Sequence, residues 1–167
     1  MGIDIRTATE SDVPRIAEIY SHYVRTALAT FEIEPPSAEE MAKRRSNVVS
    51  RGLPYLAADE NGTLVGYAYV SPYHTRMAYR FSVEDSIYVH PEHIGKGIGR
   101  LLMTELIAQT EKCGCRQIVA IIGDSANTAS IKLHEQFGFR HVGVLRSIGF
   151  KFERWVDTVL MQRELKG

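Results

Sequence analysis

A glycine-rich turn between a β-like run and a helical run is the segment of this chain most suited to chemistry. The turn contains Gly95, Gly97 and Gly99; Val83–Val89 before it resembles a strand, and apolar residues recur at helical spacing after it. Because glycine lacks a Cβ, the backbone can bend tightly there and direct successive N–H groups at an anion. The open donors and the positive dipole end of the following helix would add to this effect. The sequence therefore predicts a cradle for a phosphate-bearing ligand.

The spacing of these glycines excludes two familiar phosphate-binding motifs. A P-loop needs G-x-x-x-x-G-K followed by Ser or Thr, and neither the first glycine nor the hydroxyl residue is in place around Lys96. A dinucleotide-binding turn reads G-x-G-x-x-G, whereas this chain reads G-x-G-x-G near its middle. A solvent-exposed turn is the alternative interpretation of the glycines taken alone.

Composition predicts a single domain that spans residues 1–167. The chain is 44% hydrophobic, which is enough for a sizeable core. Lys plus Arg and Asp plus Glu number 20 each, so broad binding to nucleic acid or to an acidic membrane is not expected. No apolar run approaches the length of a membrane span, and the first residues lack the apolar stretch of a signal peptide. The two cysteines, Cys113 and Cys115, favour reduced thiols in a cytoplasmic protein over a disulfide or a metal site.

Periodicity and capping signals predict an α/β (α+β) fold, with a mixed, mostly antiparallel sheet and helices on both of its faces. Ser11 and Ser37 are placed to cap helices, and Asn61-Gly62 predicts a hairpin turn. The strands are expected at Ile3–Arg6, Tyr55–Asp59, Leu64–Val70, Val83–Val89, Arg116–Ile122, His141–Gly149 and Trp155–Leu165, and the helices at Ser11 to about Arg25, Ser37 toward Ser50, about Gly97 to Lys112, and from the Asp124–Asn127 loop to Gly138.

Two segments of the sequence resemble the GNAT N-acetyltransferase superfamily, and the resemblance covers nearly the whole chain. They are the strand–glycine turn–helix unit and residues 127–139, which read NTASIKLHEQFGF. Within the superfamily the chain is most similar to phosphinothricin N-acetyltransferases and to their relatives that act on methionine sulfoximine and methionine sulfone. The motifs of that subgroup are AYRFSVE at residues 78–84, LHE at 133–135, and GFK at 149–151 followed by Trp155 and Asp157. The resemblance implies acetyl-CoA as co-substrate, no metal, and direct attack by an amino-acid-like amine in a ternary complex.

Two positions depart from the superfamily pattern. Ile94 stands where Gln or Arg is usual. Because the phosphate contacts there are mostly made by backbone N–H groups, we expect this change to tune the affinity for acetyl-CoA rather than abolish it. His134 stands where the superfamily often has a tyrosine as general acid, and phosphinothricin-type members resemble this chain in having histidine.

Two residues are the candidates for proton transfer. Moving an acetyl group from a thioester to an amine requires a base for the amine and neutralisation of the departing thiolate. Glu84 is the predicted base, because it lies near the open end of the central strand and because residues 82–86 resemble the subgroup; a glutamate paired with Arg80 is the alternative. His134 is predicted to donate a proton to the CoA sulfur or to orient it, since histidine titrates near neutral pH. Local packing within its helix is the alternative.

The resemblance assigns further residues to the two substrates. The expected acetyl-CoA contacts are Ile87, Tyr88 and Val89 through their backbone, Gly95, Lys96, Gly97, Ile98, Gly99 and Arg100 around the diphosphate, and Asn127 and Ser130 at the start of the next helix. Helix capping alone would also explain Asn127, and a solvated position would explain Arg100. The expected amine-site residues are Phe31, Tyr73, Arg76, Tyr79, Arg80, Val83 and Glu84, with Arg80 before Arg76 as the partner of a substrate carboxylate.

The resemblance also implies a homodimer, in which the aromatic-rich hairpin around residues 149–155 is covered near the amine site. Three other functions stay open on the sequence alone. One is a GNAT enzyme for a polyamine, an aminoglycoside or a protein N-terminus, although Arg76 and Arg80 near Glu84 oppose cationic substrates. The others are a non-catalytic CoA-binding module and a dinucleotide-dependent oxidoreductase, which the glycine spacing disfavours.

Overall fold

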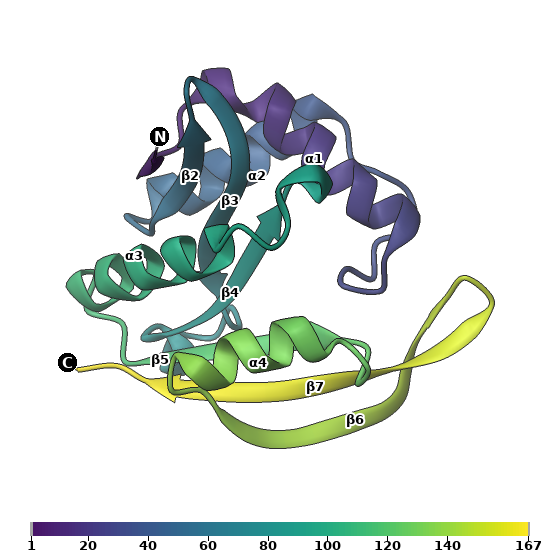
Figure 1. The fold of residues 1–167 in the computed structure, drawn as a ribbon. Helices are drawn as coiled ribbons and strands as arrows, with labels where there is room; N and C mark the ends of the chain where they lie inside the picture. Colours follow the sequence, from purple (N-terminus) through teal and green to yellow (C-terminus); the bar gives the residue numbers. More distant parts are fainter. Residues whose placement is uncertain (1, 167) are drawn as a thin grey trace.

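A seven-stranded sheet with the order β1-β2-β3-β4-β5-β7-β6 forms the centre of the structure, a computed structural model that describes residues 2–166 (Figure 1). All neighbouring strands are antiparallel except β4 and β5, which confirms the mixed, mostly antiparallel sheet. The strands are β1 (Ile3–Thr7), β2 (Tyr55–Glu60), β3 (Thr63–Pro72), β4 (Ser82–Val89), β5 (Gln117–Gly123), β6 (Arg140–Lys151) and β7 (Arg154–Glu164). The helices are α1 (Val13–Thr26), α2 (Ala38–Ser50), α3 (Ile98–Lys112) and α4 (Thr128–Gln136), with short 3-10 turns at Glu10–Asp12, Met77–Tyr79 and Pro91–His93.

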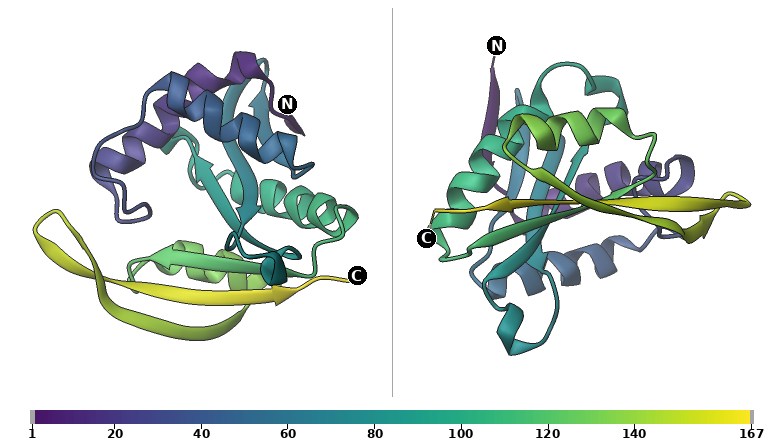
Figure 2. Two further views of the ribbon diagram at one scale, coloured as in Figure 1. Left: turned by 180° about the vertical axis from the view of Figure 1, so that it is seen from behind. Right: turned by 90° about the horizontal axis from the view of Figure 1, so that it is seen from below.

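Helices cover both faces of the sheet, as the sequence predicted. Helices α1 and α2 lie on one face, and α3 and α4 lie on the other (Figures 1 and 2). On the first face, Ile16 and Ile19 of α1 join a buried cluster with Tyr67 of β3. On the second face, Leu102 of α3 belongs to a larger cluster that also contains Ile118 of β5. The two apolar clusters fix the helices on opposite sides of the strands.

Most of the predicted turn and cap signals are confirmed. The Ser37 hydroxyl accepts a hydrogen bond from the Glu40 N–H at 3.0 Å, and the Asn127 side chain accepts one from the Ser130 N–H at 3.3 Å. These bonds satisfy donors that the first turns of α2 and α4 leave open. Gly138, with φ +82°, follows the end of α4 as expected.

The start of α1 differs from the prediction, because Ser11 is not its cap. Thr9 and Asp12 instead form a capping box around the short 3-10 turn. The Thr9 N–H donates to the Asp12 carboxylate at 2.8 Å, while the Ser11 hydroxyl lies 2.8 Å from the Thr9 hydroxyl. A carboxylate is a stronger acceptor than a hydroxyl, and Arg6 holds this carboxylate in place.

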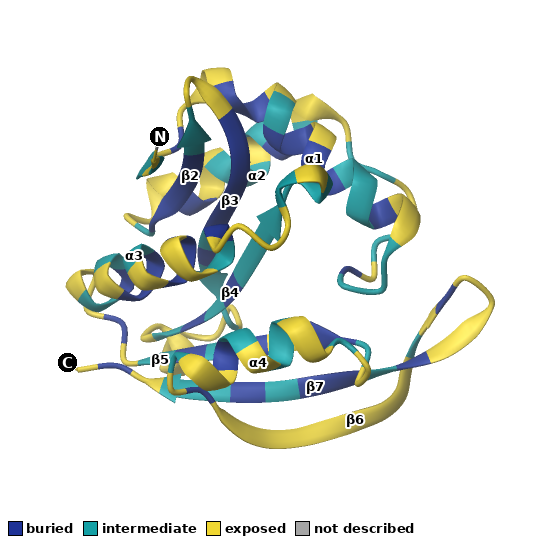
Figure 3. Ribbon diagram, viewed as in Figure 1, coloured by how far each residue is buried: buried dark blue, intermediate teal, exposed yellow. Residues whose placement is uncertain are grey.

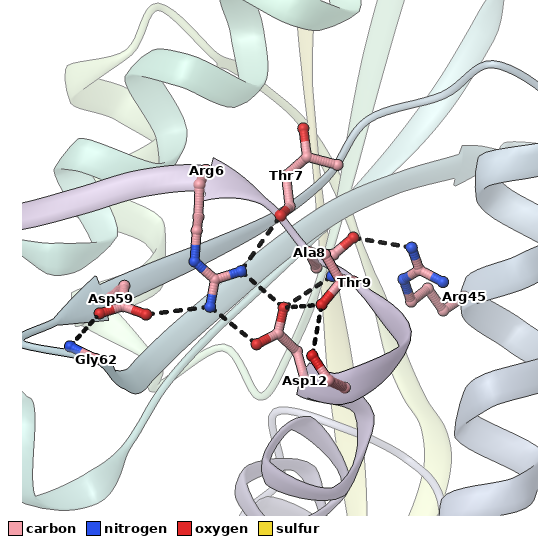
Figure 4. A network of polar contacts seen from close by, with 9 residues as sticks. Arg6, Thr7, Ala8, Thr9, Asp12, Arg45, Asp59 and Gly62 are labelled. Atoms are coloured by element: carbon pink, nitrogen blue, oxygen red, sulfur yellow. Dashed lines mark hydrogen bonds and ion pairs between the residues drawn. The ribbon is translucent and has the colours of Figure 1, made fainter.

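Arg6 joins β1, β2 and the start of α1 through two carboxylates (Figure 4). Its guanidinium donates to the two Asp12 oxygens at 2.7 and 2.9 Å and to Asp59 at 3.1 Å. Asp59 in turn accepts the Gly62 N–H at 2.7 Å, in a turn where Asn61 and Gly62 have φ values of +52° and +86°. The hydrogen bonds from Arg6 are the main reason that the pKa of Asp12 lies below its usual range. The network fixes the predicted hairpin turn to the first helix.

The two parallel strands stay together over a very short length. Residues Ser82–Glu84 of β4 pair with Gln117–Val119 of β5, although β4 continues to Val89 and β5 to Gly123. Beyond Glu84, β4 remains bonded to β3 and β5 to β7, so the facing edges of β4 and β5 separate. In the described part of the chain, those edges have no strand partner there. Unpaired backbone groups inside a protein are costly, so this opening predicts a ligand that satisfies them.

Strand β6 is an exposed edge with a strongly apolar surface. Figure 3 shows almost its whole length exposed to solvent. Ile148 is 60% exposed and Trp155, across the hairpin in β7, is 66% exposed; the further exposed apolar residues of the hairpin are Val142, Val144, Leu145, Phe150 and Phe152. A long apolar edge strand favours pairing with another surface.

Replacing Asp12 by Asn should lower the free energy of unfolding at pH 7 by about 1–2 kcal/mol, because charge-assisted hydrogen bonds are lost and part of Arg6 is solvated. The pKa of Asp12 is depressed in the folded protein, so its contribution is present above the unfolded value of 3.8 and is lost as the pH falls through the lower folded value. Urea unfolding of the wild type and the variant between pH 7 and pH 2 should show that the difference in their free energies of unfolding becomes smaller as the pH falls. An equal loss at every pH would contradict the ionic origin, and the exposed Asp4→Asn variant is the control.

Candidate active site

A cleft of about 700 Å³ occupies the opening between β4 and β5. Its walls come from both faces of the sheet: Tyr20 and Tyr69 on the side of α1, and His134 on the side of α4. The separated strand ends, residues 84–89 and 120–123, form its middle. The cleft therefore connects the two faces through the sheet.

The glycine turn lies at one end of this cleft and has the backbone that the sequence predicted at two of its three glycines. Gly95 and Gly97 have φ values of +87° and +79°, which other residues rarely adopt. Gly97 is the N-cap of α3 and makes no side-chain capping bond, so the first N–H groups of α3 are available to a ligand. Gly99 does not serve the turn. It lies inside the first turn of α3, where a Cβ would come 3.5 Å from Leu133 of α4.

Most of the predicted site residues line the cleft. They are Phe31, Glu84, Ile87, Tyr88, Val89, Gly95, Gly97, Ile98, Gly99, Arg100, Asn127, Ser130 and His134. Lys96 does not: its ammonium lies 3.1 Å from His93 Nδ1 and 3.9 Å from the Glu60 carboxylate. The Val89 carbonyl accepts the Tyr23 hydroxyl, so the backbone of β4 is already engaged at this point.

The other predicted amine-site residues, including both candidate partners of a substrate carboxylate, lie outside the cleft. Tyr73, Arg76 and Tyr79 line a separate hollow of about 430 Å³ on the loop before β4. Arg80 places its guanidinium 4.5 Å from the centre of the Phe81 ring, and the Val83 side chain is in the core at 2% exposure. Their roles toward a substrate therefore stay predictions.

Glu84 lies on the α1 face of β4 and lines the cleft. Among residues 2–166 no ion pair joins it to Arg80, which removes the alternative explanation of a paired surface glutamate. Burial, and then the negative charge of Asp85, raise the pKa of Glu84 to about 7. A carboxyl group with this pKa can both take and release a proton near neutral pH.

His134 is buried at 5% exposure and has both ring nitrogens engaged. Nδ1 lies 2.7 Å from the Ser130 carbonyl oxygen, and Nε2 lies 2.7 Å from the Asp85 carboxylate. Burial alone would lower the pKa of His134, but the charge and the hydrogen bond of Asp85 outweigh burial and raise it. Asp85 is a site residue that sequence reasoning missed.

Neighbouring residues of β4 place these groups on opposite faces of the sheet. Because side chains alternate along a strand, Glu84 points toward α1 and Asp85 toward α4. The alternation, together with the rarity of buried aspartate without a partner, was the signal that could have identified Asp85 from the sequence. The opening between the strands brings a base on one face and a paired histidine on the other to a single cleft.

The α1 side of the cleft has an aromatic wall that was also not predicted. Tyr20, Tyr23, Tyr69 and Tyr88 line it, and the rings of Tyr20 and Tyr88 meet edge to face at 5.2 Å. The Tyr20 hydroxyl lies 2.8 Å from the Thr30 hydroxyl. Sequence analysis predicted a role only for the backbone of Tyr88 and did not identify the other three residues.

The loop after α1 closes this side of the cleft through contacts with the C-terminal hairpin. Lys151 is 2% exposed, and its ammonium donates to the carbonyl oxygens of Ala27 and Thr30, both at 2.7 Å. A Cβ on Gly149 would lie only 2.3 Å from the Phe31 ring, so this ring rests directly on the backbone of β6. The loop thus holds Phe31 in the wall of the cleft.

Two further properties of the described residues concern metal ions and membranes. No group of three or more His, Cys, Asp or Glu residues in positions 2–166 could hold a metal ion. None of the helices in this range has the length and apolarity needed to span a bilayer.

The sequence and the fold match known acetyltransferases. The family model described as "Acetyltransferase (GNAT) family" matches residues 16–139. A phosphinothricin N-acetyltransferase from Alcaligenes faecalis is 52% identical over 161 residues, which cover 96% of this chain and 82% of the relative. An L-methionine sulfoximine/L-methionine sulfone acetyltransferase from Salmonella typhimurium is 37% identical over 161 residues, which cover 96% of this chain and 94% of the relative. Among solved structures, the chain is similar to the crystal structure of a GNAT superfamily phosphinothricin acetyltransferase from Sinorhizobium meliloti in complex with AcCoA. The TM-score is 0.95 and the sequence identity is 46%, and the match covers 99% of this chain and 89% of the other.

The raised pKa of Glu84 predicts that Glu84→Gln stabilises the fold above neutral pH. A carboxyl with a folded pKa of about 7 and an unfolded value of 4.5 favours folding below 4.5 and loses that contribution as the pH rises to about 7. At pH 8 the variant should melt a few degrees above the wild type, since ~1 kcal/mol shifts Tm by roughly 2–4 °C in a domain of this size. Thermal unfolding measured at pH 8 and at pH 5 should show a smaller difference in Tm between the variant and the wild type at pH 5. Glu34→Gln, in the exposed loop before α2, is the control; identical differences at both pH values would refute the raised pKa.

Proposed function

The chain belongs to the acetyltransferase (GNAT) family, and we propose that it transfers the acetyl group of acetyl-CoA to the α-amino group of a small amino-acid-like substrate. The substrate is of the phosphinothricin, methionine sulfoximine or methionine sulfone type, by analogy with the relatives named above. The observation that carries this proposal is the position of Glu84, with a pKa of about 7, at the point where β4 and β5 separate. That point is where an amine and an acyl donor can meet from opposite faces of the sheet.

The residues around the cleft fit acetyl-CoA. The glycine turn and the uncapped start of α3 offer backbone N–H groups and a positive dipole end to a diphosphate. The free edge of β4 from Ile87 to Val89, apart from the Val89 carbonyl that already accepts the Tyr23 hydroxyl, offers backbone groups to the amides of the pantetheine arm. Acetyl-CoA supplies the acetyl group in activated form as a thioester. Arg100, in the first turn of α3, adds a positive charge to the cleft wall, and its guanidinium donates a hydrogen bond to Gln136 of α4.

Glu84 and His134 divide the proton transfers between the two faces of the sheet. Glu84, on the aromatic side, removes a proton from the incoming ammonium group, directly or through a water. Burial supports this role, because it raises the pKa of Glu84 toward the pH at which a base is most effective. His134, on the α4 side, provides the proton for the thiolate that leaves.

The substrate pocket is assigned to the α1 side of the cleft. Tyr20, Tyr69 and Phe31 form an aromatic wall there, against which the side chain of a compact amino acid can pack. Arg80 and Arg76 remain the proposed partners of the substrate carboxylate, supported by their place on the loop that leads into β4.

The test is a thiol-release assay with acetyl-CoA and a panel of amines: phosphinothricin, methionine sulfoximine, methionine sulfone, common amino acids and polyamines. We expect turnover with the first three, and a kcat/KM that falls as the pH drops below about 7, because Glu84 is then protonated. Glu84→Gln should lower kcat by about 10²–10⁴-fold, while calorimetry still detects acetyl-CoA. Binding of acetyl-CoA without turnover of any amine would indicate a non-catalytic CoA-binding protein, and preferred turnover of polyamines would reject the amino-acid assignment.

A homodimer in the cytoplasm is the proposed form of the protein. The exposed apolar surface of β6 and of the β6–β7 hairpin supports the dimer, because an apolar edge strand favours pairing. The contact between Lys151 and the loop after α1 connects this hairpin to the amine side of the cleft. The cytoplasmic assignment rests on the two free thiols of Cys113 and Cys115.

Light scattering coupled to size-exclusion chromatography tests the dimer. The wild type should have about twice the chain mass of 18.8 kDa. Ile148→Glu places a charge on the apolar face of β6 and should shift the protein to the monomer, because burying an unpaired charge is costly. Val49→Glu, on an exposed position of α2, is the matched control and should leave the mass unchanged. A wild type that stays monomeric at tens of micromolar concentration would reject the dimer.

A further inference from the structure

Asp85 and His134 form a buried pair at the side of the cleft where the proposed acyl donor lies. Their side chains are 2% and 7% exposed, and Nε2 of His134 lies 2.7 Å from one Asp85 oxygen. The other Asp85 oxygen, Oδ1, is buried and has no hydrogen-bond partner among the described residues. The two residues are 49 positions apart and connect α4 to β4 across the opening.

The hydrogen-bond partners of the ring define its protonation. A carbonyl oxygen can only accept a hydrogen bond, so Nδ1, which faces the Ser130 carbonyl, carries a hydrogen. Nε2 faces a carboxylate, which is also an acceptor when ionised. The contact therefore needs a second hydrogen on the line between Nε2 and Asp85. An ionised Asp85 places it on the ring and makes His134 an imidazolium.

Few other charged groups face this pair. From β4, Glu84 points to the opposite face; from α3, Arg100 lines the cleft near the glycine turn; the stretches of β5 and β7 that line the cleft, residues 120–123 and Thr158, carry no titratable group. Asp85 is thus the carboxylate in contact with His134. Without it, burial would favour the neutral imidazole.

We infer that Asp85 is a positioning residue of the acetyl transfer: it keeps His134 doubly protonated and fixes its Nε2 at the opening between β4 and β5. The inference rests on the proposed function. In the step it serves, the N–H bond at Nε2 breaks and its electron pair stays on nitrogen. The proton leaves its hydrogen bond with Asp85 and forms the S–H bond on the departing thiolate. Over one turnover the ammonium group of the substrate loses two protons. One replaces the proton that His134 gave, and the other is released to solvent.

Asp85 also acts on the base that lies beside it in sequence. Its charge is the second cause, after burial, of the raised pKa of Glu84. Removing this charge should lower the pKa of Glu84 and that of His134 together. Because Glu84 acts when deprotonated and His134 when protonated, both limbs of the pH profile of kcat should move to lower pH. A residue that only supports the fold would lower the profile without moving both limbs.

Asp85→Asn is the first experimental arm, because the amide has nearly the same shape and no charge. We expect kcat to fall about 10- to 100-fold, with the KM for acetyl-CoA changed by less than about threefold. Both limbs of the pH profile should shift to lower pH. Asp4→Asn, at an exposed position of β1, is the matched control and should behave as the wild type. The inference would be overturned if Asp85→Asn had the same kcat as the wild type. It would also be overturned if kcat fell but both limbs of its pH profile stayed at the wild-type pH.

The second arm uses the wild-type protein and needs no turnover. Nitrogen NMR of histidine-labelled protein, with the His134 signals assigned by their loss in His134→Gln, reports the protonation of each ring nitrogen. We expect both nitrogens of His134 to be protonated at pH 7.5, and Nδ1 alone in Asp85→Asn. A neutral His134 ring in the wild type would overturn the inference even if Asp85→Asn failed to fold. Absence of acetyl transfer by the wild type would reject the proposed function instead, and the NMR result would still decide the state of the pair.

Discussion

The short pairing between β4 and β5 is the constraint on which the rest of the structure depends. Three residue pairs join the two parallel strands, and beyond Glu84 each strand remains bonded only to its outer neighbour. A sheet that parts in this way exposes backbone donors and acceptors inside the molecule, at a cost that a bound ligand can offset. The parting also lets one cleft reach both faces of the sheet. Glu84, Asp85, His134 and the glycine turn all lie along this opening or at its end.

The same opening explains the electrostatics of the site. Adjacent carboxylates on one strand point to opposite faces, so Glu84 and Asp85 influence each other by charge without sharing a partner. Asp85 is paired with His134, and its negative charge favours the protonated ring of that histidine. Glu84 is instead buried beside a like charge, and both effects raise its pKa. One carboxylate is therefore held as a partner and the other as a base. Two different protonation behaviours arise from neighbouring residues because the strand alternates.

Local signals in the sequence predicted the elements and the glycine turn, whereas contacts across the sheet escaped prediction. The turn at Gly95 and Gly97 and the cap at Asn127 depend on a few adjacent residues, and the structure confirms them. The start of α1 was predicted wrongly because Asp12, fixed by Arg6 of another element, accepts the Thr9 N–H and forms a capping box there, and Ser11 does not act as the cap. Alternation along β4 indicates that Asp85 needs a buried partner, but that partner, His134, lies 49 positions away, so no local pattern identifies it. The resemblance to a family identified His134, but its physical partner required the fold.

Across the parting of β4 and β5, functional groups make three of the contacts that join the two halves of the molecule, beside the apolar core that both halves share. The first join is the pairing that ends at Glu84, and the second is the buried contact of Asp85 with His134. The third is Lys151, which binds the carbonyl oxygens of the loop after α1 and so holds Phe31 in the cleft wall. A change in the relative position of the halves would alter the base, the histidine and the amine pocket together. The larger apolar cluster also spans both halves, since it contains Val83 of β4 together with Ile118 of β5. The polar contacts add fixed directions to that packing and so define how the base, the histidine and the amine pocket face one another.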